Sequence, residues 1–350
     1  MKLRFPLTLV AVVLLAGPLG RAADVLRPKV VVVAMFEPGQ DTGDAPGELQ
    51  FWVEREKLDR VLPLPAAFHD VRANADGSVV AIVTGVGNTR AAASIMALGG
   101  DPRFDFSKSY WLVAGIAGVD PADASLASAA WAEWVVNGDL GHEIDPREAP
   151  KDWPTGYVPL RKSRPYEQPP APDDSSQVFH LDPGLVNWAF ELTKNMPLVD
   201  TAGMAARRKK FSGFPNAQRP PFVLKGDTLS SETFWHGRLL NAWANEWVKY
   251  HTAGRGNYVT TAMEDTGTLQ SLTWLARAGR VDVRRVLVLR TASNFDQQED
   301  GTTAAESLFG EKLGSYSAYV PALESAYRVG STVVHELVAH WPRYEKEIPR

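Results

Sequence analysis

Short apolar runs bounded by glycine, proline or polar residues recur along the chain, and amphipathic segments lie between them. An apolar run of about four to eight residues is typical of a buried strand, whereas apolar positions at about every third or fourth residue predict a helix. This pattern predicts strands over residues 27–35, 78–84, 110–114, 129–136, 221–225, 257–262 and 283–291. It predicts helices over residues 89–98, 185–196, 199–210, 237–251, 266–278 and 316–340. Because strands alternate with helices and are apolar on both faces, we expect one three-layer α/β/α domain.

Residues 140–182 interrupt this alternation. They are rich in proline and in charged residues and show little periodicity. We expect a long irregular excursion from the domain here, of the kind that often carries function.

The N-terminal segment has the composition of a secretory signal. Two basic residues precede an apolar stretch over residues 5–19, and small residues follow it. We therefore expect a signal peptide over residues 1–23, a mature domain over residues 24–350 and a periplasmic or secreted location. The alternative is an uncleaved anchor, but a membrane span needs about 20 apolar residues. Since no later segment has such a run, we expect no membrane span in the mature chain.

The composition argues against several classes of protein. The net charge is -4, without a basic block, which disfavours binding to nucleic acid. The chain has no cysteine that could act as a nucleophile, and its seven histidines form no metal-binding pattern such as HExxH. We expect neither a metal nor a cofactor.

Two glycine-rich turns follow predicted strands, and ligands in open α/β sheets collect at the carboxyl ends of strands. Gly85 and Gly87 precede a predicted helix, whose first backbone N–H groups would favour an anion or a polar oxygen. Gly115 and Gly118 follow the next strand and would let a ligand approach the backbone. The alternatives are a tight strand–helix turn and a packing bulge.

Polar side chains stand at the ends of later strands, and an aromatic cluster follows Gly226 and Asp227. Glu264 could bind sugar hydroxyls or a metal, whereas we expect Asp265 to cap the following helix. Asn294 offers both a donor and an acceptor, which suits the edge of a heterocyclic base, or it is a turn residue. Phe234 and Trp235 could stack on a flat ring, or they are packing residues.

Six segments in this order resemble the purine nucleoside permease (NUP) family, whose fold is similar to that of nucleoside phosphorylases and nucleosidases. The resemblance extends from about residue 29 to residue 340. It rests on KVVVVAMFEPG, VTGVGNTRAA, YWLVAGIAGVDP, LKGDTLSSETFWHG, TTAMEDTGTLQSL and VLRTASNFD. It implies a nucleoside phosphorylase-like fold, a three-layer α/β/α sandwich with a central mixed sheet.

The resemblance also implies roles for individual residues. A phosphate or the attacking water would lie at Gly85, Gly87, Asn88, Thr89 and Arg90. The base would lie against Gly115, Ile116, Ala117, Phe234, Trp235 and Asn294. Met263 and Glu264 would bind the ribose, and Glu37 lies near the position of a water-activating carboxylate.

Two departures from the family pattern bear on the chemistry. Asn294 stands where many relatives have an aspartate, and an amide cannot deliver a proton to a leaving base. Asp296 is the candidate substitute. Arg90 is the one cation near the predicted anion site, whereas phosphate is usually held by firmer clamps. These departures favour hydrolysis or binding over phosphorolysis.

The sequence therefore leaves two principal functions open. The first is an exported enzyme that cleaves the N-glycosidic bond of purine nucleosides as a nucleosidase or a phosphorylase, with phosphate as a co-substrate in the second case. The alternative is a non-catalytic nucleoside-binding component that delivers its ligand to a separate inner-membrane transporter. A relative with a degraded site is a third reading of the same residues. In each case a homo-oligomer is expected.

Overall fold

The computed structural model describes residues 25–168, 177–310 and 318–350. The predicted signal peptide therefore lies outside the described residues. Among the residues described, no helix has both the length and the hydrophobicity needed to cross a bilayer.

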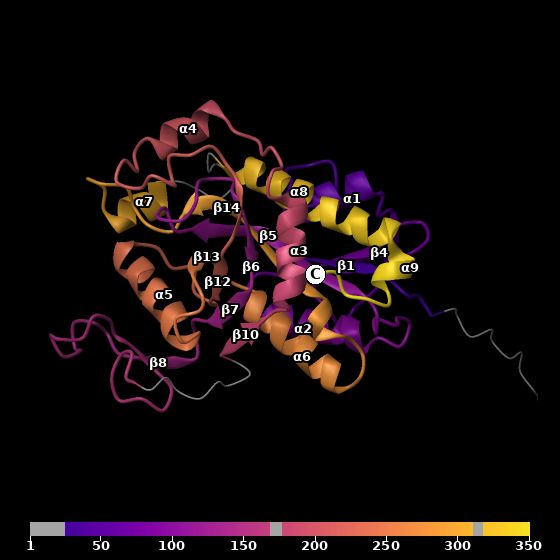
Figure 1. Cartoon of the computed structure of the whole chain (residues 1–350), viewed down its shortest axis with the longest axis horizontal. Coiled ribbons are helices and arrows are strands. Elements are labelled where there is room, and N and C mark those ends of the chain that lie inside the picture. The colour runs from indigo at the N-terminus through magenta and orange to yellow at the C-terminus, as the bar shows by residue number, and fades with distance from the viewer. Residues whose placement is uncertain (1–24, 169–176, 311–317) are drawn as a thin grey trace, which may run out of the picture.

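A large mixed sheet runs through the molecule (Figure 1). Its strands are β1 (Val30–Ala34), β2 (Arg60–Leu62), β3 (Val71–Ala73), β4 (Val79–Val83), β5 (Tyr110–Val119), β6 (Ala129–Ala132), β7 (Trp134–Asn137), β10 (Val178–His180), β11 (Val223–Lys225), β12 (Asp227–Ser230), β13 (Tyr258–Ala262) and β14 (Val286–Phe295). β5 lies at the centre, where it pairs in parallel with β1 and β14 and antiparallel with β13. The mixed α/β architecture predicted from the sequence is confirmed.

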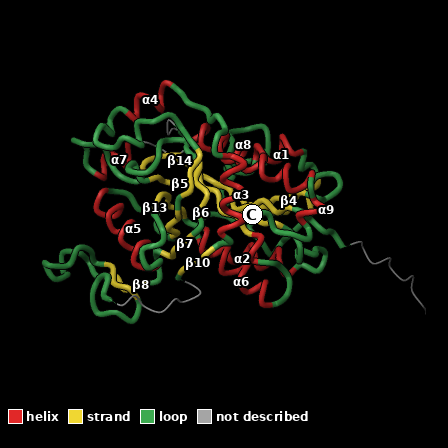
Figure 2. The backbone as a smooth tube through the Cα atoms, viewed as in Figure 1, coloured by secondary structure: helices red, strands yellow, loops and turns green. Residues whose placement is uncertain are grey.

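Helices cover both faces of this sheet (Figure 2). They are α1 (Gln50–Glu56), α2 (Asn88–Gly100), α3 (Pro183–Thr193), α4 (Ala202–Arg208), α5 (Arg238–His251), α6 (Asp265–Arg277), α7 (Ala304–Gly310), α8 (Tyr319–Ala339) and α9 (Trp341–Tyr344), with a 3₁₀ turn at Val283–Arg285. α2 packs along α6 on one side, whereas α8 packs on β5 and β14 from the other. The central strands are thus apolar on both faces because helices enclose both.

The structure extends the two central strands beyond their predicted ends. β5 continues to Val119 and β14 to Phe295, because the two strands pair with each other along nearly their whole length. The single strand predicted over residues 129–136 is instead two strands, β6 and β7. They separate at Glu133, where the Asp227 carboxylate accepts hydrogen bonds from the backbone N–H groups of Glu133 and Trp134.

The predicted excursion over residues 140–182 carries some regular structure. β8 (Gly141–Glu143) and β9 (Tyr157–Pro159) form a two-stranded antiparallel sheet of their own. β10 then joins the main sheet beside β7. Among the described residues, the pattern also missed α1, α7 and α9 and the strands β2, β3 and β12, all of which are short.

Close packing of α2 against α6 depends on Gly267. A Cβ atom at this position would overlap the backbone carbonyl of Asn88. We expect Gly267→Ala to destabilise the protein by about 1–3 kcal/mol, because the two helices must separate. Urea unfolding of the purified protein measures this.

Gly100 on α2 supplies the matched control, because a Cβ atom there meets nothing within 4 Å. Gly100→Ala should leave the stability unchanged or raise it by about 0.4–1 kcal/mol. Equal effects of the two substitutions would contradict the packing argument.

Candidate functional site

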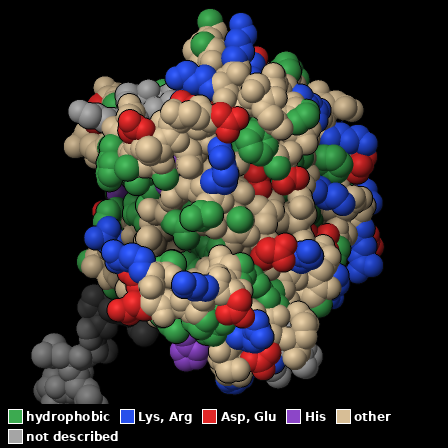
Figure 3. Space-filling view, turned by 90° about the vertical axis from the view of Figure 1, so that its left-hand side faces the viewer, with side chains coloured by type: hydrophobic (Ala, Val, Ile, Leu, Met, Phe, Trp, Pro, Cys, Tyr) green, Lys and Arg blue, Asp and Glu red, His purple; other side chains and the backbone are tan. Residues whose placement is uncertain are grey.

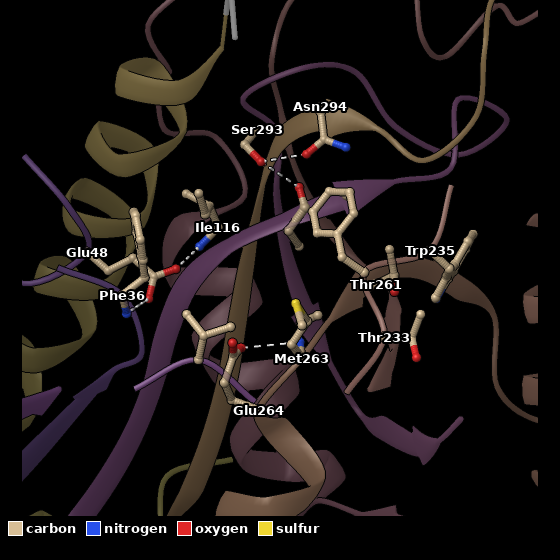
Figure 4. Close-up of a pocket in the computed structure, with 15 residues that line it drawn as sticks. Phe36, Glu48, Ile116, Thr233, Trp235, Thr261, Met263, Glu264, Ser293 and Asn294 are labelled. Atoms are coloured by element: carbon tan, nitrogen blue, oxygen red, sulfur yellow. Dashed lines mark hydrogen bonds between the residues drawn. The ribbon is translucent and has the colours of Figure 1, made fainter. Parts of the chain in front are cut away.

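A cavity of about 170 Å³ opens where β5, β13 and β14 end. Its walls combine apolar side chains with two carboxylates and a few neutral polar groups (Figure 4). The lining residues are Phe36, Glu48, Val86, Ile116, Ala117, Gly118, Thr233, Phe234, Trp235, Thr261, Ala262, Met263, Glu264, Ser293 and Asn294. A concave, mostly apolar site with a few convergent polar groups is the usual form of a small-molecule site.

A buried ion cluster centred on Arg290 supports one wall of the cavity. The Arg290 side chain on β14 is 1 % exposed. Its Nη2 donates to Asp265 Oδ1 at 2.6 Å and to Glu264 Oε2 at 3.0 Å, and its Nη1 donates to the carbonyl oxygen of Ile116 at 3.0 Å. One guanidinium thus faces two carboxylates. Arg290 was not among the site residues predicted from the sequence.

Glu264 points from this cluster into the cavity. Besides Arg290, its carboxylate accepts from the backbone N–H groups of Gly87 at 3.4 Å and Met263 at 3.2 Å. Burial raises the pKa of Glu264, while the neighbouring charge of Arg290 opposes that rise. These contacts fix the carboxylate at the predicted position, next to Met263.

The prediction that Asp265 caps the following helix is wrong. Asp265 is the first residue of α6, and the position before it is occupied by Glu264, whose side chain makes no capping hydrogen bond. The Asp265 carboxylate is fully buried and is bound to Arg290 instead. Its role is therefore to balance a buried charge.

Glu48 is a cavity residue that sequence reasoning missed. Its Oε2 accepts from the backbone N–H groups of Met35 at 2.7 Å and Phe36 at 3.1 Å, and its Oε1 accepts from Ile116 N–H at 2.7 Å. Burial raises the pKa of Glu48 to about 7; the charge of Arg290 opposes this rise and that of Glu264 adds to it. Figure 4 shows Glu48 and Glu264 on the same side of the cavity, away from Asn294 and Trp235.

Gly115 lies behind Glu48 rather than in the cavity wall. A Cβ atom at position 115 would overlap Glu48 Oε1 and the end of the Met35 side chain. The predicted close approach at Gly115 therefore exists, but it serves a buried carboxylate of the protein itself. Ile116 and Ala117, the next two residues, do line the cavity.

Glu37, the predicted water-activating residue, does not line the cavity. Its carboxylate accepts from the backbone N–H groups of Gly47 at 2.6 Å, Leu49 at 2.7 Å and Gln50 at 2.8 Å. It thereby closes the loop after β1 and satisfies N–H groups at the start of α1. Glu48 lies at the far end of this loop. In the sequence it belongs to no periodic apolar segment and follows no predicted strand, so nothing singled it out as a site residue.

The predicted phosphate or water site at the start of α2 contains a carboxylate of the protein. Thr89 donates from its backbone N–H at 2.6 Å and from its hydroxyl at 2.7 Å to Glu232 Oε1. Asn88 Oδ1 accepts from Gly267 N–H at 2.9 Å, and Arg90 lies over the ring of Phe68. Among the residues of the glycine-rich turn before α2, Val86 lines the cavity. Gly85 and Gly87 lie beside it with φ of 82° and 99°, which glycine adopts without strain.

The predicted base-binding residues Phe234, Trp235 and Asn294 line the opposite end of the cavity. Asn294 Oδ1 accepts from the Ser293 hydroxyl at 2.8 Å, and its Nδ2 donates to the carbonyl oxygen of Phe295 at 3.0 Å. Since Nδ2 carries two hydrogens, one donor is left for a ligand. On the nearby face that carries α4, α5 and α7, hydrophobic side chains gather around a hollow (Figure 3).

Asp296, the proposed substitute acid, does not line the cavity. It is fully buried, where Asn241 Nδ2 donates to both its oxygens at 3.1 Å and the Tyr258 hydroxyl donates to Oδ2 at 2.5 Å. Burial and the charge of Asp120 raise its pKa well above the ordinary value. Among the described residues that line the cavity, the acids are Glu48 and Glu264, and no group of side chains in the described ranges is arranged to hold a metal ion.

A family model and two curated relatives with the same description match most of this chain. A family model described as purine nucleoside permease (NUP) matches residues 27–349. A protein of Schizosaccharomyces pombe described as a probable purine nucleoside permease is 29 % identical over 341 residues, which covers 93 % of each chain. A purine nucleoside permease of Candida albicans is 28 % identical over 335 residues, covering 93 % of this chain and 79 % of the relative.

Solved structures with the same fold include a nucleosidase and a hydrolase. The 5'-methylthioadenosine/S-adenosyl homocysteine nucleosidase of Helicobacter pylori superposes with a TM-score of 0.54 at 12 % identity, covering 90 % of this chain and all of the other. The futalosine hydrolase of the same organism gives 0.53 at 13 %, covering 89 % of this chain and 99 % of the other. These likenesses confirm the nucleoside phosphorylase-like fold.

Removal of the Arg290 charge should destabilise the fold. In Arg290→Met the carboxylates of Glu264 and Asp265 stay buried without their partner, which costs about 3–5 kcal/mol. A thermal or urea unfolding curve measures this loss. The control is Arg284→Met, which breaks the surface pair with Asp282 and should leave the midpoint unchanged. Equal midpoints for the two variants would show that the cluster is not a stabilising centre.

Proposed function

Because the chain belongs to the purine nucleoside permease (NUP) family, we propose that its cavity binds a purine nucleoside and hydrolyses the N-glycosidic bond. The observation that carries the proposal is the Glu48 carboxylate. It is buried, held in place by three backbone N–H groups and directed into the same cavity as Glu264. A carboxylate with a pKa of about 7 is suited to accept a proton near neutral pH.

Glu264 is the proposed ribose anchor. A carboxylate binds two neighbouring sugar hydroxyls well because each hydroxyl can donate to one of its oxygens. Arg290 and two backbone N–H groups hold the carboxylate in position before any ligand arrives. Met263 beside it supplies an apolar surface for the carbon side of the sugar.

In the proposed reaction a water molecule attacks the anomeric carbon while the bond to the base nitrogen breaks. Glu48 takes the proton of the water, and the carboxylates near the ribose stabilise the positive charge that develops on the sugar. The electron pair of the broken bond leaves with the base. Asn294 donates a hydrogen bond to the leaving base, which then takes its proton from solvent. The products are ribose and the free base.

Water rather than phosphate is the proposed acceptor. A phosphate at the start of α2 would need the N–H and hydroxyl donors of Thr89, and both are bound to Glu232. A second anion beside this carboxylate would also be repelled. The side chain of Arg90 makes its contact with Phe68 instead.

The competing function is nucleoside binding without cleavage, in the service of a separate transporter. The names of the fungal relatives favour it. So does Asn294, since an amide at the base end cannot donate a proton to the leaving group. We propose export of the chain in both cases.

Nucleoside cleavage is tested with purified protein and inosine, adenosine or guanosine, with and without phosphate. We expect free base and ribose at a rate that phosphate does not change. Ribose 1-phosphate, formed only with phosphate, would instead identify a phosphorylase. Tight binding without release of base would establish the binding protein.

Glu232→Ala tests the exclusion of phosphate. In this variant the donors of Thr89 become accessible, so phosphate should inhibit nucleoside cleavage.

Glu48 should control the reaction rate and its dependence on pH. The base acts in its deprotonated form, so kcat should rise with pH through about 7 and level off above it. Glu48→Gln should lower kcat by about 10²–10⁴-fold and remove this rise. Glu37→Gln is the matched comparison, because it breaks the loop contacts but leaves the cavity intact; it should lower the melting temperature and keep kcat. The opposite assignment would follow if Glu37→Gln abolished activity and Glu48→Gln did not.

A further inference from the structure

A small polar hollow lies directly behind the base end of the cavity. Phe234 and Asn294 line both spaces, so the two adjoin at these side chains. The hollow is completed by Arg207 of α4, His236 and Ser307 of α7, among others. Its free volume is about 10 Å³, which is roughly the space of a single atom or one water molecule.

Two polar atoms at this hollow lack a hydrogen-bond partner. Ser307 is 8 % exposed, and its Oγ is buried without a partner; the same holds for Nε2 of His236. A buried polar atom without a partner destabilises the folded protein, because the atom has lost its hydrogen bonds to water. Two such atoms beside one hollow point to a ligand atom that completes them.

The electrostatics of the hollow favour an acceptor. Arg207 lies at its edge with a guanidinium that can only donate, and Nη1 pairs with Glu299 at 2.6 Å. Burial lowers the pKa of His236 to about 4, and the charge of Arg207 adds to this shift. The imidazole is therefore neutral at pH 7 and can present an N–H at Nε2. The Ser307 hydroxyl can donate as well.

We propose that this hollow binds the exocyclic oxygen at position 6 of the base, so that the site selects 6-oxopurine over 6-aminopurine nucleosides. The inference rests on the proposed function, because it requires the base to lie at the Asn294 end. In a purine, N7 and the 6-substituent lie on the same edge. A base whose N7 accepts from Asn294 Nδ2 thus directs its 6-substituent past Asn294 toward Ser307 and His236.

A 6-amino group does not fit this arrangement as well. It would place its own N–H donors beside the guanidinium of Arg207, which offers no acceptor, and it could satisfy Ser307 or His236 only as acceptors. Sites that hydrogen-bond a polar substituent reject analogues that mismatch it, because their own polar groups are then left unpaired.

The test compares three ligands that differ only at position 6: inosine, adenosine and purine riboside, which has hydrogen there. Dissociation constants come from calorimetry on the Glu48→Gln variant, which should bind without turnover. We expect inosine to bind at least about 10-fold more tightly than adenosine, which corresponds to one hydrogen bond of about 1.4 kcal/mol. Ser307→Ala should weaken inosine about 10-fold and leave purine riboside unchanged.

Ser325→Ala is the matched control, because Ser325 of α8 is also buried with an unpartnered hydroxyl but lines neither the cavity nor the hollow. It should not change the binding of any of the three ligands. Equal affinities for inosine and adenosine in the unmutated site, or equal loss of all three ligands in Ser307→Ala, would overturn the assignment of the hollow alone. Failure of every nucleoside to bind, in wild type as well as in Glu48→Gln, would overturn the proposed function with it.

Discussion

The guanidinium of Arg290 is the group on which the geometry of the site depends. It connects β14 to the first turn of α6 through Asp265, to the cavity through Glu264 and to the carbonyl of Ile116 on β5. Two buried carboxylates without this charge would be unstable unless they took up protons. With it, Asp265 and Arg290 compensate each other, and Arg290 opposes the rise that burial causes in the pKa of Glu264.

Glu48 lies close to the same cluster of charges. Its carboxylate accepts from backbone N–H groups just after β1 and within β5, and the nearby Arg290 and Glu264 act on its pKa in opposite directions. A carboxyl group with a pKa near neutral pH suits the acid–base role proposed for Glu48. The cavity thus has one end with two carboxylates, the proposed ribose end, and another with Asn294 and aromatic side chains, the proposed base end.

Much of this arrangement could be predicted from the chain. Apolar runs bounded by turns located the main strands, since burial on both faces demands such runs. Strand ends located Met263, Glu264, Ile116 and Asn294, and the aromatic cluster after Gly226 and Asp227 located Phe234; all of these line the cavity. The short elements escaped prediction because three to seven residues carry too little periodicity, and β5 and β14 were predicted too short because their mutual pairing extends them.

The order of apolar runs and turns was enough to predict the α/β alternation and most of the strand ends from which the site is built. The contacts of each carboxylate could be read only from the folded chain. Glu37 and Glu48 stand at the two ends of one loop, and nothing local distinguishes them; folding gives Glu37 to the N–H groups before α1 and Glu48 to the cavity. Likewise, Glu232 reaches Thr89 across 143 positions of the chain. Such assignments depend on contacts between distant segments, which no local pattern of polarity contains.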